Sequence, residues 1–289
     1  MKPVFRLLIN RWIARHAASG LNVNAKVAHL HPAVLVTGGS SGIGLAIAHV
    51  FHNQGETVVL VARDDTRLAA ALSGFPRPTA APRVFTLALD VTAADALDRI
   101  DATLDALGLT LDILVNAAGA GLAGHFYSHN QAAIDHLLAI NVDALTRLTR
   151  HFLPQMIARA RGGILNVASL GGYVPGPGQA AYYASKAYVC SLTEAIAAEI
   201  AGSGVRITVV APGPVATTFH AAMGADHSLY RWLLPAISPE RVATAAVTGY
   251  HWGRTVVVPG LVPKMLAVAV AVLPHAVTLP LVRLLLALR

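Results

Sequence analysis

Short runs of aliphatic residues alternate with longer amphipathic segments through the middle of the chain. The aliphatic runs predict strands at 33–37, 57–62, 83–89, 111–116, 163–168 and 205–210. Apolar residues at helical spacing between them predict helices at about 45–54, 65–73, 93–107, 130–159 and 181–202. Strands that alternate with helices form right-handed crossovers. We therefore predict one α/β domain at 33–258, a doubly wound parallel sheet with helices on both faces.

The N-terminal segment 1–32 mixes apolar and basic residues and contains no acid. One side of a helix would collect its large apolar residues, namely Phe5, Leu8, Ile9, Trp12 and Ile13. Asn10 and Arg11 interrupt the apolar run, which argues against a cleaved signal peptide and against a spanning helix. We predict a basic amphipathic extension that lies on a membrane surface or packs on its own domain or on a partner subunit.

The C-terminal segment 259–289 is almost entirely apolar. Between positions 265 and 282 the only polar side chains are His275 and Thr278, and this length suits one bilayer crossing. Pro274 and Pro280 interrupt the run, however, and proline inside a helix costs about 3 kcal/mol. We therefore predict two short apolar helices that line a substrate entrance, form a subunit interface or dip into lipid.

Composition narrows the class of protein. The 289 residues are 55% hydrophobic with a single cysteine, which excludes a disordered chain, a disulfide scaffold and a cysteine-based zinc site. The net charge of +7 arises at the two ends, since residues 33–251 hold 13 basic residues and all 15 acids. A nucleic-acid partner is not expected for such a body. We expect a cytoplasmic protein, peripheral on the inner face of a membrane if the basic ends contact anionic lipid.

A glycine-rich loop follows the first predicted strand and opens the first helix. Its small residues allow a pyrophosphate to approach the backbone, and the helix N-terminus offers free N–H groups. The alternative is a plain glycine-rich turn, but the flanking strand and helix favour a dinucleotide site. The loop residues assigned to cofactor binding are Thr37, Gly38, Ser40, Ser41, Gly42, Ile43 and Gly44.

The end of the second strand indicates which cofactor is preferred. Ala62 occupies the place where many dinucleotide sites carry an acid for the ribose hydroxyls. Arg63 follows it, and Arg67 lies one helical turn further on; a guanidinium suits a 2′-phosphate. We predict that NADP(H) is preferred. In the alternative, Arg63 is solvated, Asp64 or Asp65 binds the ribose, and NAD(H) is used.

A tyrosine and a lysine four residues apart, Tyr182 and Lys186, share one face of a predicted helix. A nearby ammonium lowers the pKa of a phenol, so the pair can exchange a proton near neutral pH. Tyr183 and Tyr188 are alternative candidates for the proton-exchanging tyrosine, but neither has a lysine four residues later. Ser169, at the end of a strand, either orients a carbonyl oxygen or caps a turn.

Taken together, these motifs resemble those of the short-chain dehydrogenase/reductase family, in its single-domain branch with a Rossmann-like fold. The resemblance covers about 33–258. Its motifs occur in the family order: Thr37-Gly38-x-x-x-Gly42-Ile43-Gly44, Asn116-Ala117-Ala118-Gly119, Asn141, Ser169, Tyr182-x-x-x-Lys186 and Pro212-Gly213-Pro214-Val215. Ala117 departs mildly from the pattern, since the family often has a second asparagine there.

The resemblance implies a role for each of these residues. Tyr182 would be the catalytic acid/base, Ser169 would hold the substrate carbonyl, and Lys186 would bind the nicotinamide ribose. Asn141 would hold a water in the proton relay. The further cofactor contacts that the resemblance implies are Asp90, Val91, Asn116, Ala117, Gly119, Pro212, Gly213, Val215 and Thr217. No metal site is expected. The implied reaction is hydride transfer between a nicotinamide and a carbonyl or alcohol carbon.

The substrate is predicted from the loop that follows Pro212, which the family uses to cover the substrate. Its large apolar residues predict a lipophilic carbonyl or alcohol with an acyl, sterol-like or polyketide-like body: Phe219, Met223, Leu229, Tyr230, Trp232, Leu233 and Leu234. Alternatively, these residues pack on the core or on a second subunit. The resemblance also implies a homo-dimer or tetramer, because the family often builds its dimer face from the helices equivalent to 130–159 and 181–202. Two other functions stay open, a non-catalytic NADP sensor or scaffold and a sugar-nucleotide epimerase or dehydratase.

Overall fold

Seven parallel strands form one sheet in the computed structural model, which describes residues 30–76, 83–225, 229–230 and 236–287. Their order across the sheet is β3-β2-β1-β4-β5-β6-β7. Their bounds are β1 His31–Thr37, β2 Thr57–Ala62, β3 Val84–Ala88, β4 Leu109–Asn116, β5 Gly163–Val167, β6 Arg206–Val210 and β7 Val256–Val257. The chain runs outward from β1 to β3, returns to β4 beside β1, and then runs outward to β7. This reversal beside β1 creates the crevice where such sheets bind ligands.

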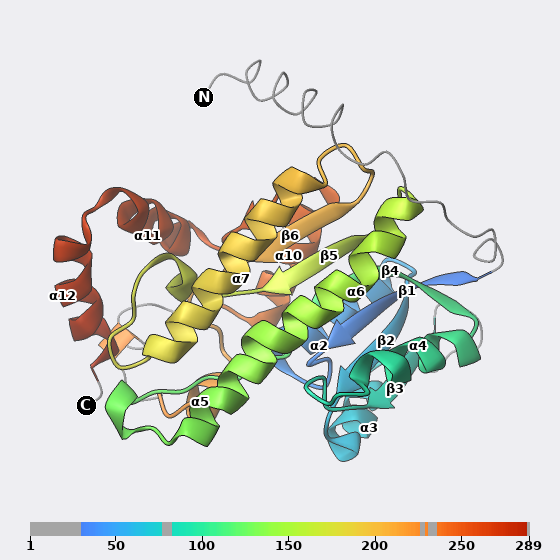
Figure 1. Cartoon of the computed structure of the whole chain (residues 1–289), viewed down its shortest axis with the longest axis horizontal. Coiled ribbons are helices and arrows are strands. Elements are labelled where there is room, and N and C mark those ends of the chain that lie inside the picture. Colours follow the sequence, from blue (N-terminus) through green and yellow to red (C-terminus); the bar gives the residue numbers. More distant parts are fainter. Residues whose placement is uncertain (1–29, 77–82, 226–228, 231–235, 288–289) are drawn as a thin grey trace.

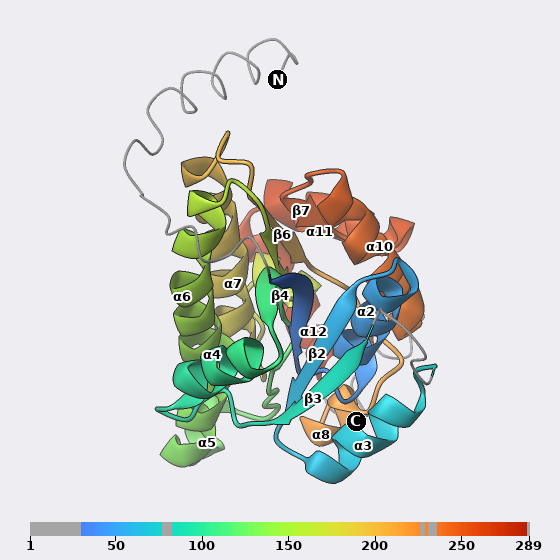
Figure 2. The same cartoon turned by 90° about the vertical axis from the view of Figure 1, so that its right-hand side faces the viewer.

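Helices cover both faces of the sheet (Figures 1 and 2). The helices of the domain are α2 Gly42–Asn53, α3 Asp65–Ser73, α4 Ala96–Ala106, α5 Gln131–Leu138, α6 Leu145–Ala158, α7 Ala180–Glu199, α8 Phe219–Ala222 and α10 Pro239–His251. Helices α2 and α10 share one hydrophobic cluster with the sheet, and α4 and α6 share the other. Both faces of β1 are buried. Val34 and Val36 contact the first cluster, and Ala33 and Leu35 contact the second, which explains the unbroken apolar run in the sequence.

The predicted α/β fold is confirmed, with two differences in its elements. The helix predicted at 130–159 is three helical segments, because a π-helical turn at Ala139–Ala144 separates α5 from α6. The prediction also lacks α10 and β7. Strand β7 is only two residues long, too short to give an alternating pattern.

Two short apolar helices end the described chain, as predicted. Helix α11 spans Leu261–Val272 and α12 spans His275–Leu286, with Pro274 at the N-cap of α12. Within the part of the chain that the structure describes, no helix has both the length and the apolar character needed to cross a bilayer. The amphipathic helix predicted within 1–32 lies almost wholly outside the described residues.

Candidate active site

Three positions of the loop between β1 and α2, namely Gly38, Gly42 and Gly44, disfavour any side chain. Gly38 has φ +65° and Gly42 has φ +54°, a region of the backbone that L-residues with side chains rarely adopt. A Cβ atom on Gly44 would collide with the carbonyl oxygen of Gly38. Ser41, the N-cap of α2, makes no side-chain hydrogen bond to the helix. The uncovered N-terminus of α2 therefore suits the pyrophosphate of a dinucleotide.

A groove of about 270 Å³ runs from this loop along the carboxyl ends of the strands. It brings together Ser41, Gly42, Ile43, Gly44, Ala117, Gly119, Ser169, Tyr182, Lys186, Pro212, Gly213, Val215 and Thr217, as well as Gly38. These residues come from five separate stretches of sequence. The loop, the walls and the proposed reacting residues therefore fit a nicotinamide dinucleotide that lies across the strand ends.

A second hollow continues the groove at the end of β2. Among the residues that line it are five that the sequence analysis assigned to cofactor binding, namely Ser40, Arg63, Arg67, Asp90 and Val91. Each guanidinium already has an acidic neighbour. Arg63 Nη1 lies 3.9 Å from Asp90 Oδ2, and Arg67 Nε lies 3.6 Å from Asp64 Oδ2. Both arginines are exposed, so these pairs leave their charge available to a phosphate.

Two carboxylates around this hollow, Asp64 and Asp90, already accept hydrogen bonds from residues close by in the sequence. Asp64 Oδ1 accepts the N–H of Arg67 at 3.0 Å and so caps α3. Asp90 Oδ1 accepts two hydrogen bonds from Thr92, at 2.9 Å and 2.7 Å. Burial raises the pKa of Asp90, but the bonds from Thr92 and the nearby Arg63 outweigh burial and lower it. Asp90 is therefore a carboxylate at neutral pH.

The side chains of Thr37 and Asn116 are turned into the protein. Thr37 Oγ1 donates to the carbonyl of Val115 and accepts the N–H groups of Ala117 and Ala118 at 3.1 Å and 3.2 Å. Asn116 Nδ2 donates to Asn166 Oδ1 at 2.9 Å. Both side chains therefore hold the end of β4 in place, and neither lines the groove or the adenosine hollow.

Tyr182 is buried at the first turn of α7 and faces Ser169. Burial raises the pKa of the Tyr182 phenol to about 12, and the hydrogen bond with Ser169 acts in the opposite direction. Burial therefore outweighs the lowering that we expected from Lys186, whose Nζ lies 5.8 Å from the centroid of the tyrosine ring. A phenol held in its neutral form beside a serine hydroxyl can donate a proton to a carbonyl oxygen.

Lys186 is buried one helical turn after Tyr182. Its Nζ donates a hydrogen bond to the carbonyl oxygen of Val167 at 3.0 Å, which fixes the ammonium at the end of β5. Burial lowers the pKa of Lys186 to about 8, with Cys190 acting weakly in the opposite direction. With two of its protons still unused, the ammonium can bind ribose hydroxyls in the groove.

Asn141 lies in the π-helical turn and binds two other elements. Its Oδ1 accepts the N–H of Ala120 at 2.8 Å, and its Nδ2 donates to the Ala120 carbonyl at 2.8 Å and to Ser185 Oγ at 2.9 Å. A Cβ atom on Gly119 would lie 3.3 Å from Asn141 Oδ1 and 3.5 Å from Lys186 Nζ. The absence of a side chain at Gly119 thus leaves room where these two groups converge.

An apolar pocket adjoins the groove and shares Ser169, Tyr182, Gly213 and His220 with it. Met223 and Tyr230, from the loop that follows Pro212, line this pocket as predicted. Trp232, Leu233 and Leu234 of the same loop lie outside the described residues. Its far wall comes from the last two helices, through Leu266, Val270, Val282, Leu285 and Leu286. Besides these five wall residues, the lining residues that the sequence analysis did not identify are Leu170, Gly171, Val174, Gln179 and His220. Only the apolar character of the tail suggested the wall.

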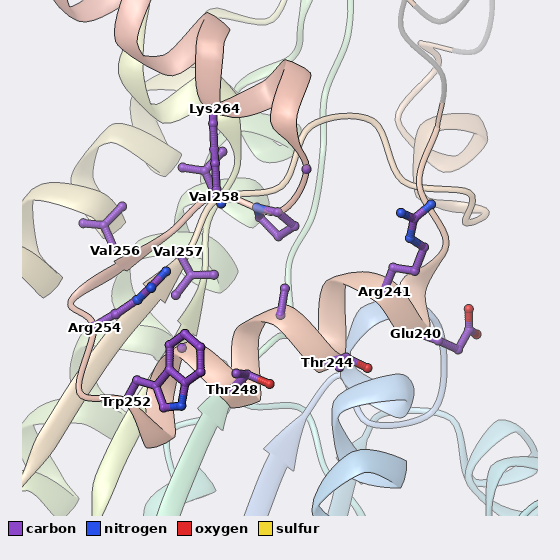
Figure 3. A pocket seen from close by; sticks show the side chains of 14 residues that line it. Glu240, Arg241, Thr244, Thr248, Trp252, Arg254, Val256, Val257, Val258 and Lys264 are labelled. Carbon is purple, nitrogen blue, oxygen red and sulfur yellow. The ribbon is translucent and has the colours of Figure 1, made fainter.

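A separate pocket of about 510 Å³ lies between α10 and the segment that joins β7 to α11. In Figure 3, Thr244 and Thr248 project from α10, while Arg254 lies against the indole of Trp252, 4.9 Å from its centroid. Lys264 of α11 lies across the top of this pocket (Figure 3). None of the motif residues lines it. The candidate active site is therefore the groove at the strand ends and not this larger hollow.

Comparison with known proteins agrees with this geometry. The sequence pattern of the short chain dehydrogenase family matches residues 32–228, which is more than half of the chain. The chain is 37% identical over 201 residues to galactitol 2-dehydrogenase (L-tagatose-forming) of Cereibacter sphaeroides, covering 68% of this chain and 77% of that protein. It is 34% identical over 215 residues to ketoacyl reductase HetN of a Nostoc species, covering 74% and 73%.

Solved structures show the same fold. A short-chain dehydrogenase from Sphingobium yanoikuyae in complex with NADPH superposes with a TM-score of 0.72 at 31% identity, covering 83% of this chain and 93% of that chain. One from Burkholderia phymatum in complex with NAD gives a TM-score of 0.75 at 25% identity, covering 88% and 96%. The chain therefore belongs to the short-chain dehydrogenase/reductase family and is an NAD(P)-dependent oxidoreductase.

Proposed function

We propose that the protein is an NADP(H)-dependent reductase of lipophilic ketones or aldehydes, with Tyr182 as the acid/base. The observation that carries this proposal is the meeting of the cofactor groove with the apolar pocket at Ser169 and Tyr182. A carbonyl placed between these hydroxyls has its body in a pocket walled by leucines and valines. Such a wall favours an acyl, sterol-like or polyketide-like body over a polyol, because it offers no hydrogen-bond partners to hydroxyl groups.

The residues divide the work of the reaction. When bound, the cofactor supplies the hydride. Ser169 and Tyr182 polarise the carbonyl oxygen, and Tyr182 then delivers its proton to that oxygen. Lys186 holds the nicotinamide ribose, and Asn141 holds the π-helical turn from which a water can resupply the proton. The raised pKa of Tyr182 favours this reductive direction, since the phenol is neutral before the reaction.

The preference for NADP(H) rests on Arg63 and Arg67. Both line the hollow at the adenosine end, and no acid follows β2 directly. Asp64 is occupied as the cap of α3, so it is poorly placed to accept ribose hydroxyls as well.

The name of one relative also supports a lipophilic substrate. The ketoacyl reductase is named for an acyl substrate, and an acyl chain suits the apolar wall of the pocket.

The test is the oxidation of NADPH against ketones and aldehydes graded by chain length and ring size, with Tyr182→Phe as the control. Turnover should rise with lipophilicity and vanish in the variant. Affinities for NADPH and NADH, measured with the wild type and with Arg63→Ala, test the cofactor preference. Tight NADPH binding without turnover of any carbonyl would favour the sensor function, and tighter NADH binding would overturn the NADP(H) preference.

A further inference from the structure

Each of the last two helices has two apolar faces, one exposed and one that lines the substrate pocket. On α11, Leu261, Met265, Val268 and Val272 repeat at four, seven and eleven residues, which places them on one side of the helix. These side chains are 64–78% exposed. The opposite side carries Leu266 and Val270, which line the substrate pocket.

Helix α12 repeats this arrangement. Val277, Leu281 and Leu284 follow one another at four and seven residues and are 47–60% exposed. Val282, Leu285 and Leu286 face the pocket. Figure 1 shows α11 and α12 one after the other at one end of the molecule, with no other described element outside them. A helix that is apolar on all sides is ordinarily buried on all sides. We therefore expect another surface to contact the exposed outer face of α11 and α12.

The charges near the exposed face of α11 and α12 indicate what kind of surface contacts it. Residues 241–289 contain no Asp or Glu. Exposed basic residues accompany each stripe, Lys264 on α11 and Arg283 on α12. A second copy of the chain seated on this face would bring these cations together without an acid to pair them. An anionic lipid surface pairs them and also takes up the apolar stripes.

We propose that the outer face of α11 and α12, defined by Leu261, Met265, Val268, Val272, Val277, Leu281 and Leu284, docks in the plane of an anionic phospholipid bilayer. The inner faces of the same helices are the wall of the substrate pocket. A lipophilic carbonyl dissolved in the bilayer therefore reaches Tyr182 by passing these two helices. This inference rests on the proposed lipophilic substrate and adds the route by which it arrives.

The experiment is flotation of the full chain with vesicles of phosphatidylcholine alone or mixed with phosphatidylglycerol. The triple variant Met265→Ser, Val268→Ser, Val272→Ser should lower partition by more than about a thousandfold, since each of the three buried apolar side chains contributes at least a factor of about ten. Lys264→Gln with Arg283→Gln should lower it by about twenty-five-fold on anionic vesicles only. Leu72→Ser with Leu138→Ser, exposed leucines on α3 and α5, is the matched control and should change nothing.

Turnover separates this inference from the proposed function. The triple variant should reduce a short, water-soluble ketone like the wild type, but lose activity on a long-chain ketone presented in vesicles. Equal vesicle binding by wild type and triple variant would overturn the docking face and leave the binding to the N-terminal segment. Self-association lost in the triple variant, without vesicle binding, would assign the face to a second copy. Vesicle binding without turnover of any carbonyl would defeat only the proposed function.

Discussion

Asn141 donates a hydrogen bond to the hydroxyl of Ser185 at 2.9 Å, which ties the π-helical turn before α6 to α7. Ser185 in turn donates to the Tyr182 carbonyl at 2.7 Å. The asparagine and the tyrosine are therefore joined through one serine, although 41 positions of sequence separate them. The bridge thus links the π-helical turn to the backbone of the helical turn that carries the tyrosine.

Removal of Asn141 should cost more stability than removal of Ser185. Asn141→Ala leaves both polar groups of the Ala120 backbone without their partner, at about 1–3 kcal/mol. Ser185→Ala keeps the two bonds to Ala120 and should cost about 1 kcal/mol. Unfolding in urea measures both variants. Equal losses would show that the bonds to Ala120 contribute little.

Binding of NADPH should weaken above about pH 8. Burial lowers the pKa of Lys186 to about 8, so its side chain is protonated below that pH and neutral above it. A neutral amine makes weaker hydrogen bonds to ribose hydroxyls than an ammonium, by about five- to tenfold in affinity. Titration by cofactor fluorescence between pH 7 and 9.5 checks this. Lys186→Arg should remove the pH dependence, because a guanidinium stays protonated; an identical fall in both proteins would assign it to another group.

Gly44→Ala should abolish cofactor binding and lower stability by about 1–3 kcal/mol. The added methyl group would collide with the Gly38 carbonyl, so the loop must move away from the position that cradles the pyrophosphate. Gly74→Ala is the matched control. Its φ is −78° and its nearest new neighbour, the Ala71 carbonyl oxygen, is 3.3 Å away. Calorimetry with NADPH compares the two variants, and normal binding by Gly44→Ala would contradict the packing of this loop.

Thr278→Val should raise the melting temperature by about 2–4 °C, which corresponds to about 1 kcal/mol. Thr278 is 3% exposed in α12, and its hydroxyl has no hydrogen-bond partner among the described residues. Replacement by an isosteric apolar side chain removes that unpaired group. Thr248→Val, at an exposed site on α10, should change little. A lower melting temperature for Thr278→Val would mean that the hydroxyl is paired.

All strands of the sheet except β7, and most residues of the groove, could be predicted because each depends on local sequence. Val34 and Val36 alternate with Ala33 and Leu35, and all four are buried, so the run identifies a central strand without further information. The glycine positions follow from backbone conformations that a side chain would obstruct. These signals need no knowledge of the distant parts of the chain.

The remaining features depend on residues that meet only in the folded chain. The pKa of Tyr182 rises because the phenol is buried, and no spacing of residues records how much water is excluded. The bond from Lys186 to the carbonyl of Val167 joins a helix to the end of a strand. Which side of α11 faces the pocket could not be read from periodicity either, since Val268 and Val270 are equally apolar.

The wall of the apolar pocket has a consequence for how such a protein diversifies. Leu266, Val270, Val282, Leu285 and Leu286 all lie beyond residue 228, where the family pattern ends, whereas Tyr182 and Lys186 lie within it. Under the proposed function, the reacting groups and the far wall of the substrate pocket are thus encoded in separate stretches of the chain. Under the proposed function, exchange of the final helices alone should change the preferred substrate body and leave the hydride chemistry intact.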